Sequence, residues 1–300
     1  MSVAAARGFG PSTLLRLGRI SNLPTVWTNV IAGTVIAGGG RSASEVGLIA
    51  LAMSALYVGG MYLNDFFDRA IDARERPTRP IVAGEIGAGT VSAIGFGLLA
   101  IGIVLMLPFG VAATLWSIAL AGAIVLYDAW HKGNAFGPTI MGLCRALVYL
   151  AAGAAMTGQF SGHLSFALVI GGVVLAAHTA GITYAARQES LDTIGSLWPM
   201  VLLAAPVIAA LPSLASGWIV PVAIVLLLAA DAAAVWLLAR RAVPGAVPRA
   251  VSGLIAAISL VDAVAVACCG ALAGGDPRLV LACAAGYPLT RLFQASIPGT

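Results

Sequence analysis

The chain has 300 residues, of which 60% are hydrophobic and only 9% are charged, and its formal net charge is +4. Soluble domains typically carry about 25% charged residues, so this composition excludes a soluble globular protein. The high hydrophobicity also excludes a disordered chain. The sequence has no basic stripe on a soluble domain, which argues against nucleic-acid binding. We therefore predict a multi-pass integral membrane protein in contact with lipid.

Nine apolar windows meet the length of about 20 residues that a membrane-crossing helix needs. They run approximately over residues 23–39, 46–67, 88–107, 110–127, 138–157, 164–186, 197–215, 218–239 and 250–272. A tenth stretch, about 279–295, contains Pro288 and Arg291 and is expected to form a half-span or a surface helix. The predicted fold is all-α: a bundle of about nine transmembrane helices in one domain over residues 1–300, around a lipid-accessible central cavity.

The connections between spans fall alternately on the two sides of the membrane, and nearly all basic residues lie in the connections of one side. The set that includes the N-terminus contains Arg7, Arg16, Arg19, Arg69, Arg74, Arg76, Arg79, Lys132, Arg187, Arg240, Arg241 and Arg249, and the opposite set contains only Arg41 and Arg278. Lys and Arg in short loops favour the cytoplasmic side. This asymmetry predicts a cytoplasmic N-terminal segment over residues 1–20 and a cytoplasmic active-site loop over residues 68–87, in an inner or plasma membrane.

The richest group of ionisable residues lies where the second window ends. Asn64, Asp65, Asp68 and Asp72 fall within an arc of about 100° on a helix that turns about 100° per residue. Three carboxylates so close repel one another unless a cation lies between them, and Mg²⁺ prefers such oxygen ligands. We predict that Asp65, Asp68 and Asp72 are catalytic metal ligands and that Asn64 contacts substrate. The alternative is a solvated helix end.

The loop that follows supplies the opposite charge. Arg74, Arg76 and Arg79 come within one short stretch after the acids. Carboxylates to hold metal beside guanidiniums to bind phosphate suit a diphosphate ester. We therefore predict that Arg74 and Arg79 bind substrate, the alternative being that these arginines only anchor the loop at the membrane surface.

These motifs resemble those of a known family. Residues 64–72 follow the pattern NDxxDxxxD, which is the first signature of the UbiA superfamily of intramembrane prenyltransferases. The Arg-Pro-Ile run at 79–81 and the segment 19–29 are similar to that family's loop and first helix. Within the superfamily the chain looks closest to the EboC-like branch.

The resemblance implies a mechanism and its partners. In the family, two aspartate-rich helix ends hold Mg²⁺ and an isoprenoid diphosphate. The metal and basic residues stabilise the departing diphosphate, and an acceptor captures the allylic cation. The implied cofactor is Mg²⁺, and the implied partners are a prenyl diphosphate, an unidentified acceptor and membrane lipid. A dry cavity would keep water away from the cation.

The second aspartate motif departs from the family pattern. Family members usually have a tyrosine followed by two aspartates four residues apart in the sixth span. Here Tyr184 is followed by Gln188 at the first aspartate position and by Asp192 at the second. The resemblance implies that Asp192 is a catalytic metal ligand, that Glu189 replaces the missing ligand, and that Tyr184, Arg187 and Gln188 bind substrate. The alternative is an ordinary polar helix end.

Three further positions have competing interpretations. The segment 127–132 is similar to a tyrosine–lysine pair of the family, which implies that Lys132 reaches the diphosphate, although a simple interfacial lysine fits equally. Asn29 matches a substrate-contacting asparagine of the family, but could instead join packed helices. Arg145 and Asp262 lie inside spans and could form a structural ion pair or contact substrate.

The leading functional hypothesis is an Mg²⁺-dependent prenyltransferase acting on a small aromatic or lipid-like acceptor. Because Gln188 alters the second motif, the same fold could instead cyclise the isoprenoid or release diphosphate. A non-catalytic transporter or lipid-handling relative is the third hypothesis. Transporters tend to place charged sites at the midplane of the membrane, whereas the acids here lie at helix ends.

Overall fold

The computed structural model describes residues 10–157, 165–187, 198–240, 243–273, 276–297 and 299. This part of the chain is helical nearly throughout and contains no strand. In chain order the helices are α1 (Pro11–Leu17), η1 (Ile20–Asn22), α2 (Leu23–Ile36), α3 (Ala43–Glu75), α4 (Ala88–Met106), η2 (Leu107–Phe109), α5 (Val111–Trp130), α6 (Gly137–Thr157), α7 (Phe166–Arg187), η3 (Trp198–Ala204), α8 (Ala205–Ala210), η4 (Leu211–Ser216), α9 (Ile219–Ala239), α10 (Ala246–Ala273) and α11 (Pro277–Ser296), where η marks a 3-10 helix.

Each of the nine predicted windows contains helix in the part of the chain that the structure describes. Seven of the described helical segments are long and apolar enough to cross a membrane, and they correspond to α3, α4 with η2, α5, α6, α7, α9 and α10. The window 23–39 forms the 14-residue helix α2, and the window 197–215 forms the short helices η3, α8 and η4. The tenth stretch forms α11, with Pro288 inside it. The predicted all-α membrane bundle is confirmed.

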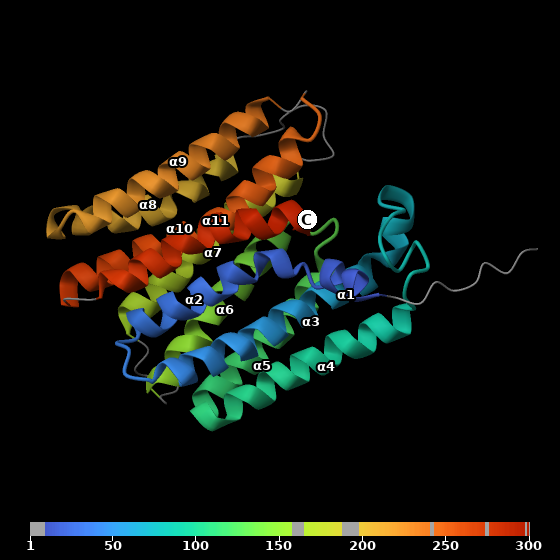
Figure 1. Cartoon of the computed structure of the whole chain (residues 1–300), viewed down its shortest axis with the longest axis horizontal. Coiled ribbons are helices and arrows are strands. Elements are labelled where there is room, and N and C mark those ends of the chain that lie inside the picture. The colour runs from blue at the N-terminus through green and yellow to red at the C-terminus, as the bar shows by residue number, and fades with distance from the viewer. Residues whose placement is uncertain are drawn as a thin grey trace, which may run out of the picture.

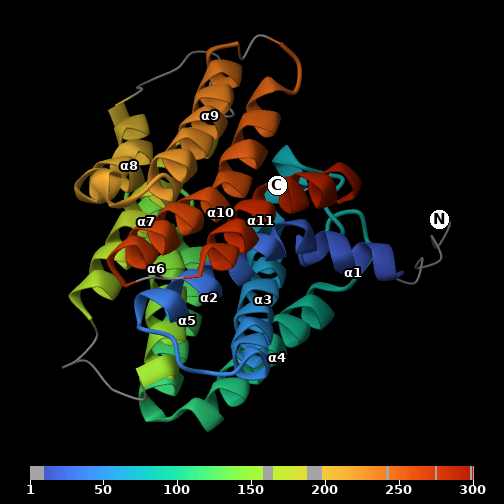
Figure 2. The ribbon, with the colours of Figure 1, turned by 60° about the vertical axis from the view of Figure 1, so that its left-hand side comes forward.

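The helices run alongside one another in an elongated bundle. Figure 1 shows α3, α4 and α5 along one side and α8 and α9 along the other, with α2, α6, α7, α10 and α11 between them. Both views bring the C-terminal end of the chain beside α1 (Figures 1 and 2). There the Asn22 side-chain amide donates a hydrogen bond to the carbonyl oxygen of Gly299, at 2.9 Å. Both ends of the described chain therefore lie at the same end of the bundle.

Helix α3 is the longest helix and carries the acid motif. It begins with a capping box, in which the Ser42 side chain accepts from the Glu45 backbone N–H and the Glu45 side chain accepts from the Ser42 backbone. Along its length it packs closely on α4, because a Cβ atom on Gly59 would lie only 2.8 Å from the carbonyl oxygen of Gly95. This close packing fixes the helix that presents Asn64, Asp65, Asp68 and Asp72.

Helix α1 holds the loop that follows α3. The Thr13 hydroxyl donates to a carboxylate oxygen of Glu85 at 2.6 Å, and Arg16 forms an ion pair with the same carboxylate. These hydrogen bonds, first from Arg16 and then from Thr13, lower the pKa of Glu85 below its ordinary value. The loop over residues 76–87 is therefore tied to the N-terminal part of the bundle, which keeps Arg79 near the end of α3.

Candidate active site

The four polar residues of the acid motif share one buried face of α3. Asn64, Asp65, Asp68 and Asp72 expose only 8%, 2%, 8% and 4% of their surface. The helical spacing that predicts a common face is thus matched by side chains turned into the bundle. Buried carboxylates are costly unless they are paired and hydrogen-bonded. The groups that surround these four residues therefore show how that cost is offset.

Asp65 lies between two arginines. Its Oδ1 atom accepts hydrogen bonds from Arg19 Nη2 and from Arg79 Nη1, each at 3.2 Å. Arg19 also donates to Asn64 Oδ1 at 3.0 Å, and it stands in the turn between α1 and η1 with a left-handed backbone (φ 41°). Sequence reasoning treated Arg19 only as a charge of the N-terminal segment and missed this contact.

Two guanidiniums therefore contact one carboxylate at Asp65. The Arg79 side chain is only 15% exposed, and burial together with the nearby charge of Arg19 lowers the pKa of Arg79, against the opposing effect of Asp65. An arginine nevertheless stays protonated in proteins. Two cations around one carboxylate can therefore attract an anion such as a phosphate group.

Asp128, near the end of α5, adds a carboxylate that sequence reasoning did not select. Asn64 Nδ2 donates to Asp128 Oδ1 at 3.2 Å, and Asp128 is only 4% exposed. The second carboxylate oxygen of Asp128, like that of Asp65, is buried and has no hydrogen-bond partner. In the sequence, the feature that could have identified Asp128 is its position as an acidic residue in the last turns of an otherwise apolar span.

Asp68 faces two basic residues from the connection between α5 and α6. Its Oδ2 atom lies 3.5 Å from His131 Nε2 and 3.8 Å from Lys132 Nζ. The His131 ring stacks on the ring of Tyr127, with ring centroids 4.6 Å apart. The structure thus brings the predicted Lys132 to the acid motif, and it adds His131, which sequence reasoning missed.

Arg187, at the end of α7, contacts the same connection. Its Nη2 atom donates to the carbonyl oxygens of His131 at 3.0 Å and of Asn134 at 2.6 Å. Tyr184 is half-buried on the same helix. The remaining residues of the predicted second motif, Gln188, Glu189 and Asp192, lie outside the described residues, so their predicted roles stay predictions.

Two predicted substrate contacts lie apart from this group. Arg74 is exposed in the last turn of α3. Asn29 is fully buried on α2, where its amide donates to both carboxylate oxygens of Asp262, each at 2.9 Å. Asn29 therefore belongs to a second polar group deeper in the bundle.

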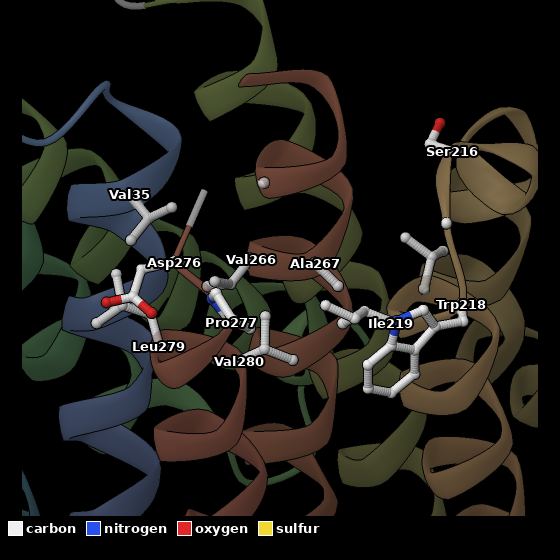
Figure 3. Close-up of a pocket in the computed structure, with 13 residues that line it drawn as sticks. Val35, Ser216, Trp218, Ile219, Val266, Ala267, Asp276, Pro277, Leu279 and Val280 are labelled. Atoms are coloured by element: carbon white, nitrogen blue, oxygen red, sulfur yellow. The ribbon is translucent and has the colours of Figure 1, made fainter. Parts of the chain in front are cut away.

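A small cavity of about 80 Å³ opens beside the acid motif, between α2, α3, α5 and α6. Tyr127 and Asp128 line it together with Arg145, and the rest of its wall is mostly apolar. A larger pocket of about 290 Å³ lies near the C-terminal ends of α2 and α10, with Trp218 at one side and Val35 and Leu279 at the other (Figure 3). None of the acids of α3 lines that pocket, so the smaller cavity is the one that adjoins the acid motif.

The donor groups are those that Mg²⁺ accepts. Asp65 and Asp128 each offer a buried carboxylate oxygen with no hydrogen-bond partner, and Asp68 and Asp72 lie on the same helix face. Within the described ranges, no three His, Cys, Asp or Glu side chains come close enough together to form a complete metal site. Mg²⁺ is usually held by one or two carboxylates with water and substrate phosphate, so this oxygen-rich set fits it.

The family model for UbiA prenyltransferases matches residues 25–253. The chain belongs to the UbiA prenyltransferase family. Among similar curated proteins, digeranylgeranylglyceryl phosphate synthase of Ignicoccus hospitalis is 36% identical over 96 residues, which covers 32% of this chain and 31% of the relative. Protoheme IX farnesyltransferase of Exiguobacterium sibiricum is 35% identical over 95 residues, which covers 31% of each chain.

The fold comparison agrees with this family membership. The apo structure of a UbiA homolog from Aeropyrum pernix K1 superposes with a TM-score of 0.63 at 18% identity, over 82% of this chain and 96% of that one. The sequence matches to the two curated relatives span about a third of each relative's length. The closer resemblance to the EboC-like branch stays a prediction.

Proposed function

We propose that this UbiA family member is an Mg²⁺-dependent intramembrane prenyltransferase, which transfers an isoprenoid group from a prenyl diphosphate to a small aromatic or lipid-like acceptor. The observation that carries the proposal is the pairing of buried acids with basic side chains at the end of α3. Asp65 lies between Arg19 and Arg79, and Asp68 faces His131 and Lys132. The names of the two curated relatives, a synthase of a prenylated glyceryl phosphate and a farnesyltransferase, support the same reaction class.

The acids of α3 are the proposed ligands of the metal. Asp65, Asp68 and Asp72 would hold Mg²⁺ from one side, and Asp192 and Glu189 would do so from the second motif. When bound, Mg²⁺ would supply positive charge to the oxygens of the leaving diphosphate. The same charge would relieve the repulsion among the carboxylates.

The basic residues would bind the diphosphate directly. Arg79 and Lys132 each lie at one of the acids, so their N–H donors can reach phosphate oxygens bound there. The Arg79 guanidinium can form a bidentate hydrogen bond, which suits the geometry of a phosphate group. The mostly apolar wall of the adjoining cavity would exclude water from the reacting carbon. Gln188 is the feature that favours a second candidate function, in which the isoprenoid is cyclised or diphosphate is simply released.

We further propose that the acid motif and the loop over residues 68–87 face the cytoplasm, in an inner or plasma membrane. The support is the accumulation of arginines on this side of the spans. A cytoplasmic site would also release the water-soluble diphosphate product directly into the cytoplasm.

The test is diphosphate release by the purified full-length protein with Mg²⁺ and a panel of prenyl diphosphates, with and without added acceptors. Asp68→Asn should lower Mg²⁺-dependent turnover by about a hundredfold or more, since it removes a proposed carboxylate ligand of the Mg²⁺ that would offset the charge of the leaving diphosphate. Asp276→Asn is the matched control, because Asp276 caps α11 far from the acid motif. Equal activity of the Asp68→Asn variant and the wild type would contradict the proposed site.

A further inference from the structure

Arg145 is a cation in the wall of the cavity beside the acid motif, and the proposed metal and diphosphate contacts do not use it. It lies on α6, and its surroundings in the cavity include apolar side chains such as Val26, Met53 and Val148. The guanidinium carbon also lies 5.8 Å from the centre of the Tyr57 ring. A charge in such surroundings is costly to bury without a partner.

A network from three helices holds the Arg145 side chain in place. Arg145 Nη1 donates to Asn29 Oδ1 at 2.8 Å, and Nη2 donates to Thr25 Oγ1 at 3.1 Å. Asn29 in turn donates to both oxygens of Asp262, and the Tyr149 hydroxyl donates to Asp262 Oδ1 at 2.6 Å. The four supporting residues are all fully buried. The guanidinium is therefore positioned rigidly, as a preformed binding group would be.

The oxygens that accept from Arg145 are neutral. Among the ion pairs of the described residues, none includes Arg145. The direct ion pair with Asp262 that the sequence suggested is replaced by a bridge, in which Asn29 lies between the two charges. Because no carboxylate binds the guanidinium directly, its fork of donors is suited to an oxyanion that enters the cavity.

Arg145 lies deeper in the bundle than the acid motif. Its neighbour Tyr57 precedes Asn64 by seven residues on α3, which is about 10 Å at the rise of an α-helix. Asp128 and Tyr127 line the same cavity and connect it to the acid motif. The cavity thus has a carboxylate where it meets the acid motif and a guanidinium farther inside.

We propose that Arg145 binds an oxyanion, a carboxylate or a phosphate monoester, of the acceptor substrate. This inference rests on the proposed transferase function and deepens it by naming a charge class for the acceptor. The carboxylate of Asp128 repels an anion, so the anionic group of the acceptor is directed inward to Arg145. Its nucleophilic atom is then turned toward the diphosphate at the acid motif. A diphosphate bound at Asp65 and Asp68 already has Arg19, Arg79 and Lys132 as its cations, which leaves Arg145 for the acceptor.

The proposal is tested by binding to the purified full-length protein in lipid nanodiscs. Isothermal titration would compare benzoate with benzamide, which has nearly the same shape and no charge, and would use phenyl phosphate as the second anion. We expect benzoate or phenyl phosphate to bind about ten- to a hundredfold more tightly than benzamide, as charge-assisted hydrogen bonds would produce. The two anions separate a carboxylate from a phosphate preference.

Two variants isolate the contribution of Arg145. Removing Arg145 alone would leave Asp262 without its counter-charge, so we compare the single variant Asp262→Asn with the double variant Arg145→Gln/Asp262→Asn. The single variant should keep the preference for the anion, and the double variant should lose it while binding benzamide unchanged. Equal binding of anion and benzamide to the wild type, or an anion preference that survives in the double variant, would overturn the proposal.

Binding of farnesyl diphosphate in the presence of Mg²⁺ separates this inference from the proposed function. In the double variant that affinity should stay within about twofold of the wild type, as expected if Arg145 and the diphosphate share no contact. A large loss of farnesyl diphosphate affinity in the double variant would mean that Arg145 serves the diphosphate, which would overturn the inference and leave the transferase function standing. Absence of farnesyl diphosphate binding by the wild-type protein would instead contradict the proposed function.

Discussion

Arg74 and Arg79 belong to the same loop region and carry the same charge, but their surroundings differ. Arg74 is exposed to solvent at the end of α3, whereas the Arg79 side chain is 15% exposed and is paired with Asp65. A solvent-exposed cation contributes little to binding because water and salt screen it. The buried guanidinium acts in a medium of lower dielectric, where its interaction with an anion is stronger.

Substitution of these two arginines should therefore have unequal effects. We expect Arg79→Gln to weaken Mg²⁺-dependent binding of farnesyl diphosphate by about ten- to a hundredfold, since one charged hydrogen bond is lost. Arg74→Gln should change the affinity by less than about twofold. Equilibrium binding to the purified variants measures both. Equal losses would show that Arg74 also contacts the substrate, as the sequence predicted.

The sequence predicted which side chains share a face of one helix, but it did not predict contacts between helices. Asp65, Asp68 and Asp72 share a face because helical geometry alone fixes their relative directions. Arg19 reaches Asp65 across 46 residues, and Asn64 reaches Asp128 across 64. Those contacts depend on how the helices pack, which no pattern within one segment encodes.

At the scale of helices, α6 and α7 approach closely at Gly142. A Cβ atom at this position would lie 2.4 Å from the carbonyl oxygen of Ala176. Small residues allow membrane helices to come this near to one another. Because the obstacle would be backbone rather than a flexible side chain, an added methyl group can be accommodated only if the two helices move apart.

Gly142→Ala should accordingly destabilise the bundle by roughly 1–3 kcal/mol, the usual cost of overpacking. Gly122→Ala is the matched control, because a Cβ atom on Gly122 in α5 meets nothing within 4 Å and alanine is the better helix former. Thermal unfolding in detergent should show a melting temperature several degrees lower for Gly142→Ala and unchanged or slightly raised for Gly122→Ala. A normal melting temperature for Gly142→Ala would contradict this packing.

Hydropathy predicted the positions of the helices better than their lengths. The seven long spans each overlap a predicted window because lipid selects runs of about 20 apolar residues. The windows 23–39 and 197–215 instead form α2 and a series of short helices. Prolines at 199, 206 and 212 interrupt the second of these windows, and each removes a backbone donor that a continuous helix needs.

For the molecule as a whole, α3 relates the acid motif to one membrane surface. Its 33 residues span about 50 Å at the α-helical rise, which exceeds the hydrocarbon thickness of about 30 Å. Its two ends must therefore lie at opposite surfaces of the bilayer. Ala43 marks one surface, and Thr78, in the arginine-rich loop just beyond the other end, marks the surface of the acid motif.

Thiol labelling at these two positions tests the proposed orientation. In a protein whose four native cysteines are replaced by alanine, Ala43→Cys should react with an impermeant thiol reagent in intact cells, whereas Thr78→Cys should react only after permeabilisation. Both positions are solvent-exposed, so the difference reports the side of the membrane rather than burial. The physical reason is the cost of moving the basic loop across the membrane, which keeps Lys and Arg inside. The reverse labelling pattern would place the acid motif and its diphosphate site outside the cytoplasm, and the diphosphate substrate would then have to be supplied from that side.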